Sequence, residues 1–363
     1  MLLTYICRGK ISTILYMNFN KLHFVFALFI SFQLSAQTEK HFKKITQLTF
    51  GGDNAEAYFS PDGEKFCFQS NNKKWGLSCD QIFMMNLSNP LKDSTDKAKM
   101  INTGIGRTTC SFYMPDSKNI LYASTHLSSN MCPESPVVKD KYVWGIFSSF
   151  DIFVSDESGN SIKQLTNQAG YDAEATVSPL GDKIVFTSTR NGDLDLYTMN
   201  IDGSDVKQIT FGLGYDGGAF FSPNGKQLVF RSSRPQTELE INEYKELLAQ
   251  DLVAPTNMEI YTCNVDGSNL KQITFLGKAN WCPFFHHDGK KIIFSSNYHS
   301  QRGYDFQLYM INTDGTGIEK ISNESNFNAF PMFSPDGKKL LFSSNRSNGG
   351  TRDTNIFIAE WGD

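Results

Sequence analysis

The chain repeats one pattern of apolar and polar positions six times. In each copy a short aromatic-rich segment leads into a polar turn, and the turn leads into an apolar segment that ends in Ser. Apolar segments separated by Pro and Gly predict β-hairpins. The six turns lie at residues 60–63, 114–117, 178–181, 222–225, 286–289 and 334–337.

A second hairpin follows in several units. Residues 200–203, 264–267 and 312–315 each contain Asp-Gly between two strand-like segments. Asp-Gly favours a tight hairpin turn in which both central residues have positive φ. Each unit therefore holds four antiparallel strands, named A to D in chain order, which is the pattern of a β-propeller blade.

The two ends of the repeat array complement each other. The sixth unit stops after its third strand, near residue 360, and lacks strand D. Residues 43–49 (KKITQLT) have a strand-D pattern with no strands A to C before them. We expect this strand to complete the last blade, which removes an exposed sheet edge. The predicted fold is all-β, a six-bladed β-propeller over residues 37–363 with the N-terminal strand closing the last blade.

The consensus of these units, with SPDG, DIY-MN-DG and QLT segments, resembles the PD40 repeat of TolB-like β-propellers. The similarity extends over roughly residues 41–363. It implies the propeller fold, and it leaves the function open because the same fold serves many tasks.

The N-terminus predicts export. Residues 22–34 are almost entirely apolar, follow Lys21, and lead to small residues before Gln37. This is typical of a secretory signal peptide at residues 1–36, cleaved near Ala36, with Met17 as an alternative start. The apolar run is short for a membrane span, which needs about 20 residues. We expect a periplasmic or secreted protein with no membrane span after cleavage.

The net charge of the chain argues against one class of binding partner. Removing residues 1–36 removes three basic groups and no acidic ones, so the net charge changes from −4 to −7. An acidic chain without a basic run is a poor nucleic-acid binder, and we expect a monomer.

Export permits disulfides, but six cysteines allow fifteen pairings and the sequence does not choose among them. They are Cys67, Cys79, Cys110, Cys132, Cys263 and Cys282.

Two long insertions mark one face of the propeller. Alternating strand directions place the A–B and C–D turns on one face and the B–C and D–A loops on the other. The insertions, at residues 127–149 in blade 2 and 235–257 in blade 4, are both B–C loops, and long loops on one face are often the binding face. The blade 2 insertion contains Tyr142 and Trp144, which either hold a ligand or pack on the scaffold.

The blade 4 insertion has a helical pattern. Thr237 and Glu240 have capping-box spacing, and Pro255 ends the predicted helix. The apolar residues at helical intervals are Ile241, Tyr244, Leu248 and Leu252. The helix is interpreted as a lid on the propeller rim, with a partner-binding helix as the alternative.

Aligning the units places one polar residue six positions before each turn. Strand A is innermost, so we expect these residues to surround the channel mouth on the long-loop face. They are Asn54, Thr108, Asp172, Asp216, Asn280 and Asn328. The residues at the strand-B exits should lie just outside that ring, and they are Asn72, His126, Arg190, Arg234, Tyr298 and Arg346. The structural alternative is that Asx residues end strands and Asp–Arg pairs hold blades together.

The predicted ligand site uses blades 3 and 4. Opposite charges and flat apolar rings suit a peptide, a protein segment or a glycan. The candidate ligand-binding residues are Asp172, Asp216, Arg190, Arg234, Tyr171, Tyr215, His126, Asn280 and Asn328.

Catalytic motifs such as HExxH and GxSxG are missing from the sequence. We therefore expect a non-catalytic binding propeller without cofactor or metal. One alternative is a metal-dependent polysaccharide lyase of the oligogalacturonate type, which resembles propellers of this kind and uses His-bound metal, with His126 and His299 on the long-loop face. The other is a scaffold that packs against an envelope protein.

Overall fold

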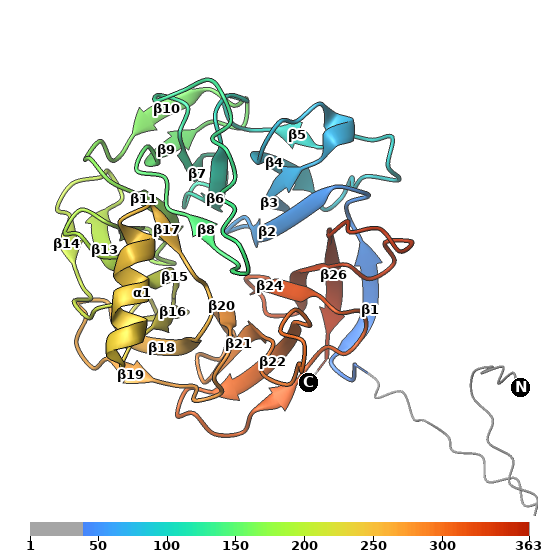
Figure 1. The fold of residues 1–363 in the computed structure, drawn as a ribbon. Coiled ribbons are helices and arrows are strands. Elements are labelled where there is room, and N and C mark those ends of the chain that lie inside the picture. Colours follow the sequence, from blue (N-terminus) through green and yellow to red (C-terminus); the bar gives the residue numbers. More distant parts are fainter. Residues whose placement is uncertain (1–38, 363) are drawn as a thin grey trace, which may run out of the picture. The chain divides into compact units, whose positions relative to one another are not determined.

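The structure, a computed structural model that describes residues 39–362, consists of six four-stranded antiparallel sheets arranged as the blades of a propeller (Figure 1). The sheets follow one another around the ring in chain order. The predicted all-β, six-bladed fold is therefore confirmed. The predicted signal peptide, residues 1–36, lies outside the described residues.

The first three blades have continuous A-to-D order from the centre outward. Blade 1 is β2 (Asp53–Phe59), β3 (Lys65–Asn71), β4 (Gln81–Asn86) and β5 (Lys99–Met100), with a 3₁₀ turn η1 (Lys73–Trp75) after β3. Blade 2 is β6 (Thr108–Tyr113), β7 (Ile120–Ser124), β9 (Asp151–Ser155) and β10 (Ser161–Gln164). Blade 3 is β11 (Asp172–Val177), β12 (Lys183–Ser188), β13 (Asp195–Asn200) and β14 (Lys207–Gln208).

The other three blades follow the same order, with a closing strand from the N-terminus in the last. Blade 4 is β15 (Asp216–Phe221), β16 (Gln227–Ser233), β18 (Met258–Asn264) and β19 (Lys271–Gln272). Blade 5 is β20 (Asn280–Phe285), β21 (Lys291–Ser296), β22 (Gln307–Asn312) and β23 (Glu319–Lys320). Blade 6 is β24 (Asn328–Phe333), β25 (Lys339–Ser344), β26 (Asn355–Trp361) and β1 (Phe42–Gln47).

The closure between the chain ends is as expected. Strand β1 pairs antiparallel with β26, and Ile45 lies opposite Ala359; Figure 1 shows the blue strand beside the red one. An ion pair of 3.1 Å between Glu39 and Arg346 adds a second link. The N-terminal segment thus covers the outer edge of blade 6.

The A–B turns explain the repeated Pro-Asp-Gly segments. In all six, the backbone N–H of the fourth residue donates to the carbonyl of the first over 2.8–3.1 Å, as Gly63 does to Ser60. The fourth residue has positive φ in every turn, which favours glycine, and Ser117 is the single exception in residue type. The Asp-Gly turns differ from the prediction: Gly203, Gly267 and Gly315 have positive φ but the preceding Asp residues do not. In these turns the Asp carboxylate accepts a hydrogen bond from the backbone N–H of the residue two positions on.

The QLT segments have an equally specific role. In every blade a side-chain oxygen two residues beyond strand D accepts a hydrogen bond from a backbone N–H of strand C, over 2.8–3.0 Å. This bond satisfies an N–H that the short strand D leaves unpaired. The six acceptors are Thr49, Asn102, Thr166, Thr210, Thr274 and Ser322.

The two insertions meet over the long-loop face. Helix α1 (Glu238–Leu248) begins at Thr237 with the predicted capping box. The helix ends at Leu248, well before Pro255, so the prediction that Leu252 belongs to it was wrong. The chain turns there, and β17 (Leu252–Val253) pairs with β8 (Trp144–Gly145) of the blade 2 insertion. We call residues 127–149 and 235–257 together the lid (Figure 1).

Candidate functional site

A β-bulge interrupts strand A in all six blades. The register with strand B shifts at the same point each time, for example between Ala55 and Tyr58 in blade 1. One residue in each bulge has a φ of 51–59°, in the left-handed region. A bulge of this kind re-aims its side chain, and all six line one cavity of about 630 Å³ on the channel axis. We call them the bulge ring: Glu56, Cys110, Glu174, Gly218, Cys282 and Phe330.

A layer of large side chains lies two residues further along each strand A. Tyr58 of blade 1 contacts Phe220 of blade 4 across the axis, with ring centroids 5.4 Å apart, and Phe112 lies 6.2 Å from Phe220. Members of this layer line the 630 Å³ cavity on one side and a second cavity of about 370 Å³ at the turn face on the other. The layer, called the floor, is Tyr58, Phe112, Thr176, Phe220, Phe284 and Met332. It divides the channel, so the larger cavity is a closed-ended chamber.

The lid forms the opposite wall of this chamber. The backbone N–H of Ile146 donates to Asp251 over 2.7 Å beside the β8–β17 pair, and Lys141 pairs with Glu243 at 2.8 Å. Arg107 of blade 2 donates to Ser135 over 3.2 Å, which ties the insertion to the propeller. Lid residues from Ser135 to Phe147 line the chamber.

Aromatic rings gather where the lid meets blades 4 and 5. Trp144 of the lid lies 5.2 Å from Trp281 and 6.4 Å, edge-on, from Tyr215. Trp281 stacks on Phe306 at 4.2 Å and donates its indole N–H to Pro255 over 2.8 Å, so its orientation is fixed. Such surfaces bind sugars and apolar or cationic side chains.

A buried charge network occupies one side of the chamber. Glu174 forms an ion pair with Arg231, and both side chains are at most one-tenth exposed. Tyr215 donates its hydroxyl to Glu174 over 2.7 Å, and the Gly218 N–H donates to the other carboxylate oxygen over 2.9 Å. The Arg231 guanidinium also stacks on Trp144 and Tyr215 at 5.1 and 4.9 Å. Burial lowers the pKa of Arg231, but the attraction of Glu174 outweighs it and raises the pKa overall.

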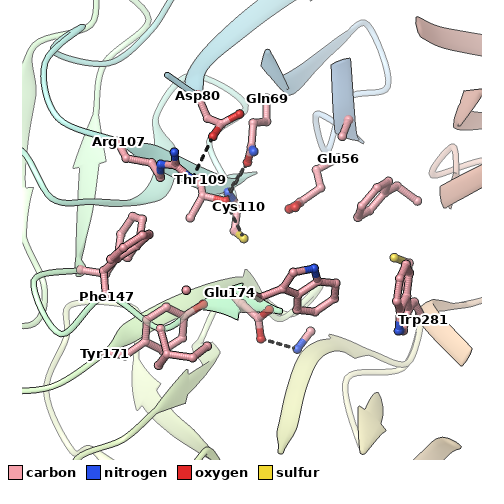
Figure 2. Close-up of a pocket in the computed structure, with 18 of the residues that line it drawn as sticks. Glu56, Gln69, Asp80, Arg107, Thr109, Cys110, Phe147, Tyr171, Glu174 and Trp281 are labelled. Carbon is pink, nitrogen blue, oxygen red and sulfur yellow. Dashed lines mark hydrogen bonds and ion pairs between the residues drawn. The ribbon is translucent and has the colours of Figure 1, made fainter. Parts of the chain in front are cut away.

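Glu56 faces this network from blade 1. Figure 2 shows its carboxylate directed into the chamber opposite Glu174, with no interaction drawn to it. Within residues 39–362 no ion pair involves Glu56. Burial and repulsion by Glu174 raise its pKa to about 7, although a hydrogen bond with Cys110 and the charge of Arg231 act in the opposite direction.

The six polar residues predicted at the channel mouth do not line the chamber. Five of them begin strand A and Asn54 is the second residue of β2, and all six are buried, with exposures of 0–1%. They bond to the preceding blade: the N–H of Asp172 donates to Phe150 over 3.0 Å, and that of Asp216 to Leu194 over 2.8 Å. We call this set the joint ring: Asn54, Thr108, Asp172, Asp216, Asn280 and Asn328.

The predicted Asp–Arg pairs form, but each stays within one blade. Asp172 pairs with Arg190 at 2.9 Å in blade 3, and Asp216 pairs with Arg234 at 2.7 Å in blade 4. Arg190 stacks over Phe186 and Tyr197 of its own blade. The arrangement therefore differs from a single polar site spanning two blades, and none of these four charged groups lines the chamber.

The remaining candidates separate into two groups. Tyr171 and Tyr215 line the chamber. Asn280 accepts from Ser296 over 2.6 Å, Asn328 accepts from Arg346 over 3.0 Å, and His126 lies against Ser124 and Phe153, all outside the lining. The ligand-binding role of the nine residues stays a prediction.

The two histidines considered for a metal lie in different blades and contact different residues. His126 is in blade 2 beside Phe153, whereas His299 is in blade 5 and contacts Tyr309 and Asp305. Among residues 39–362, no group of three or more His, Cys, Asp or Glu side chains has the arrangement of a metal site. The six cysteines outside the predicted signal peptide are free thiols.

The sequence comparison identifies the repeat. The TolB beta propeller domain family (PD40) matches residues 147–247 and 245–359, more than half of the chain. The chain belongs to the PD40 family. No curated protein sequence matches this PD40 propeller significantly.

Solved structures match this chain at low sequence identity. A putative TolB from Agrobacterium tumefaciens is 18% identical, with 86% of this chain and 91% of that chain covered and a TM-score of 0.57. An oligogalacturonate lyase in complex with manganese is 14% identical, with 88% and 93% covered and a TM-score of 0.48. A nidogen/laminin complex is 9% identical, with 75% of this chain and 81% of that chain covered and a TM-score of 0.50. In the described part of the chain, no helix is long and apolar enough to cross a membrane.

The sequence contains one signal for the chamber residues. At the joint-ring position the repeats keep a polar residue, whereas two residues later they hold Glu, Cys, Glu, Gly, Cys and Phe. A position whose residue type varies this much among copies of one structural unit does not have the same packing contacts in every blade. The bulge that turns these side chains into the channel has no such signature in a single sequence.

Proposed function

We propose that this chain is an exported, non-catalytic propeller that binds a segment of a peptide or protein partner in the chamber beneath the lid. The observation that carries the proposal is the closed-ended chamber of about 630 Å³, with aromatic rings, a fixed ion pair and a lid built from both long insertions. Binding sites are typically concave, mostly apolar and equipped with a few fixed polar groups, in this range of volumes.

The floor decides which kind of segment suits the chamber. Because Tyr58, Phe112 and Phe220 meet across the axis, a chain cannot thread through the channel without displacing them. A ligand must enter and leave by the lid side. A chain end or a protruding loop fits this geometry. Among the nine residues predicted from sequence, Tyr171 and Tyr215 are the proposed contacts, and the other seven are proposed to support the blades.

Peptide and glycan arrays probed with the protein, followed by calorimetry on the hits, test this function. Trp144→Ala should weaken a peptide hit at least about tenfold, since it removes an aromatic wall. Phe211→Ala is the matched control, because Phe211 is 76% exposed and does not line the chamber. Hits that bind both variants equally well would place binding elsewhere on the surface, and hits among glycans alone would replace the proposed ligand class.

Export is part of the same proposal and has its own test. It rests on the apolar segment at residues 22–34 and the small residues that precede Gln37. Expression in a bacterial host with an intact secretion system should give a mature protein that begins near Gln37, as read by N-terminal sequencing. A mature form that retains residues 18–36 contradicts cleavage.

A further inference from the structure

Three acidic and three basic side chains line the chamber, but one of the acids has no ion-pair partner within residues 39–362. Its charged residues are Glu56, Asp80, Arg107, Lys141, Glu174 and Arg231. Within this set Arg107 pairs with Asp80 at 3.5 Å and Arg231 with Glu174, while Lys141 pairs with Glu243 of the lid at 2.8 Å. Glu56 remains without a cationic partner among the described residues.

The fold holds Glu56 in this position. Its φ of 54° belongs to the bulge of β2, so the backbone rather than a flexible loop directs the side chain into the chamber. The half-buried carboxyl is held above the floor residue Tyr58. A carboxylate that is partly removed from water and lacks a cation is destabilised unless a ligand supplies one.

The nearby cation cannot do so. The Arg231 guanidinium is fixed by Glu174, by the Tyr215 hydroxyl at 2.6 Å and by stacking on Trp144. The other groups that act on Glu56 are the Cys110 thiol, Glu174 and Asp80, and none of them brings positive charge. The free side of the carboxylate faces the open chamber (Figure 2).

We propose that Glu56 binds a cationic group of the peptide ligand, with the aromatic rings of the lid and blade 5 packing around it. The cation is a lysine side chain, an arginine side chain or a free amino terminus, since all three form a charge-assisted hydrogen bond with a carboxylate. Trp144 and Trp281 supply ring surfaces that attract cations. This inference rests on the proposed function and defines the chemistry of its ligand.

The pairing has a definite pH dependence. Glu56 has a pKa of about 7, raised by burial and by Glu174, so the empty chamber gains its negative charge as the pH rises through neutrality. A lysine side chain stays protonated over the same range. Affinity for a lysine peptide should therefore rise from pH 6 to pH 8 and level off above it, and binding near pH 7 should release protons.

Four blocked tripeptide amides and one unblocked peptide test the proposal by calorimetry on the full mature chain. The blocked probes are N-acetyl-Ala-X-Ala-amide with X as lysine, arginine, norleucine or glutamate, and the unblocked probe is Ala-Ala-Ala-amide. At least one cationic probe should bind about tenfold more tightly than the norleucine probe at pH 8, and which one does so identifies the source of the cation. Glu56→Gln should abolish this preference and its pH dependence, whereas Glu64→Gln on the turn face should keep both.

The outcomes separate this inference from the proposed function. Equal binding of the norleucine and cationic probes to the unmodified protein overturns the cation site while leaving a peptide-binding chamber. A preference that survives in Glu56→Gln also overturns it. If no cationic probe binds, the cation site is wrong whatever other ligand class the arrays reveal. Circular dichroism of Glu56→Gln shows whether the variant is folded, and its retained binding of the norleucine probe provides the second check.

Discussion

The joint ring and the bulge ring are two residues apart on the same six strands, yet they have opposite environments. Joint-ring side chains are buried and bond to their own blade or to the preceding one. Bulge-ring side chains point into the chamber and include a carboxyl without a cation. In a regular strand, residues i and i+2 share a face. The bulge breaks this rule, so one strand can both join the blades and line a binding site.

This contrast predicts that the joint ring carries stability and the bulge ring carries binding. The largest effect should come from Asp216→Ala. Burial raises the pKa of Asp216 although Arg234 opposes the shift, so the pair already tolerates a desolvation cost. Removing the carboxylate leaves Arg234 without its partner and should lower the free energy of unfolding by about 3 kcal/mol. Urea denaturation measures it, with the exposed Asp182→Ala as control, and a loss below about 1 kcal/mol would contradict the joint role.

The second effect tests the bulge itself. Gly218 has a φ of 59°, and an added Cβ would overlap the Arg231 guanidinium. Gly218→Ala should cost about 2 kcal/mol, part from the left-handed φ and part from displacing Arg231. Gly277→Ala is a matched control, since Gly277 has a φ of 67° and open space around it. Equal losses in the two variants, measured by thermal unfolding, would show that Arg231 moves at no cost.

A third and smaller loss of stability tests whether a hydrogen bond at the outer edge of a blade stabilises the protein, as the joint ring is expected to do. Thr274→Val keeps the shape of the side chain but removes the acceptor for the Ile260 N–H at 2.8 Å. The unsatisfied N–H should lower the free energy of unfolding by about 1.5 kcal/mol. The comparison is Thr103→Val at an exposed position, and hydrogen exchange at Ile260 gives a local reading. An unchanged exchange rate there would refute the role assigned to strand-D threonines.

The smallest predicted effect on stability is a gain rather than a loss. The folded-state pKa of Glu56, about 7, lies above its ordinary value of 4.5, so the fold holds this proton more tightly than the unfolded chain does. Stability from this group is complete below pH 4.5 and is lost as the pH rises toward 7. Glu56→Gln should therefore be slightly more stable than the unmodified protein at pH 8, by less than about 1 kcal/mol because the carboxyl is partly exposed and solvent screens it, and equal to it at pH 4. Lower stability of the variant at pH 8 would mean that Glu56 has a cationic partner in the protein itself.

The sequence by itself determined the blade count, the closure and the two faces. Six Pro-Asp-Gly-type turns, the Asp-Gly turns and the orphan strand before Leu48 specify local hydrogen bonds that need no distant partner to be recognised. The capping box of Thr237 and Glu240 is local in the same way, and it placed the start of α1 correctly. Each of these signals works over a few residues, where backbone geometry follows from residue type.

Only the tertiary structure decided where side chains point around the axis. The place of Asp172 and Asp216 at the start of the innermost strand predicted that they would reach the channel mouth, but the bulge turns Glu174 and Gly218 into the chamber instead. The pairing of β8 with β17 was equally hidden, since it joins segments more than a hundred residues apart. The unpaired carboxyl of Glu56 faces a chamber only because six blades bring their bulges to one axis, and no local sequence pattern encodes that convergence.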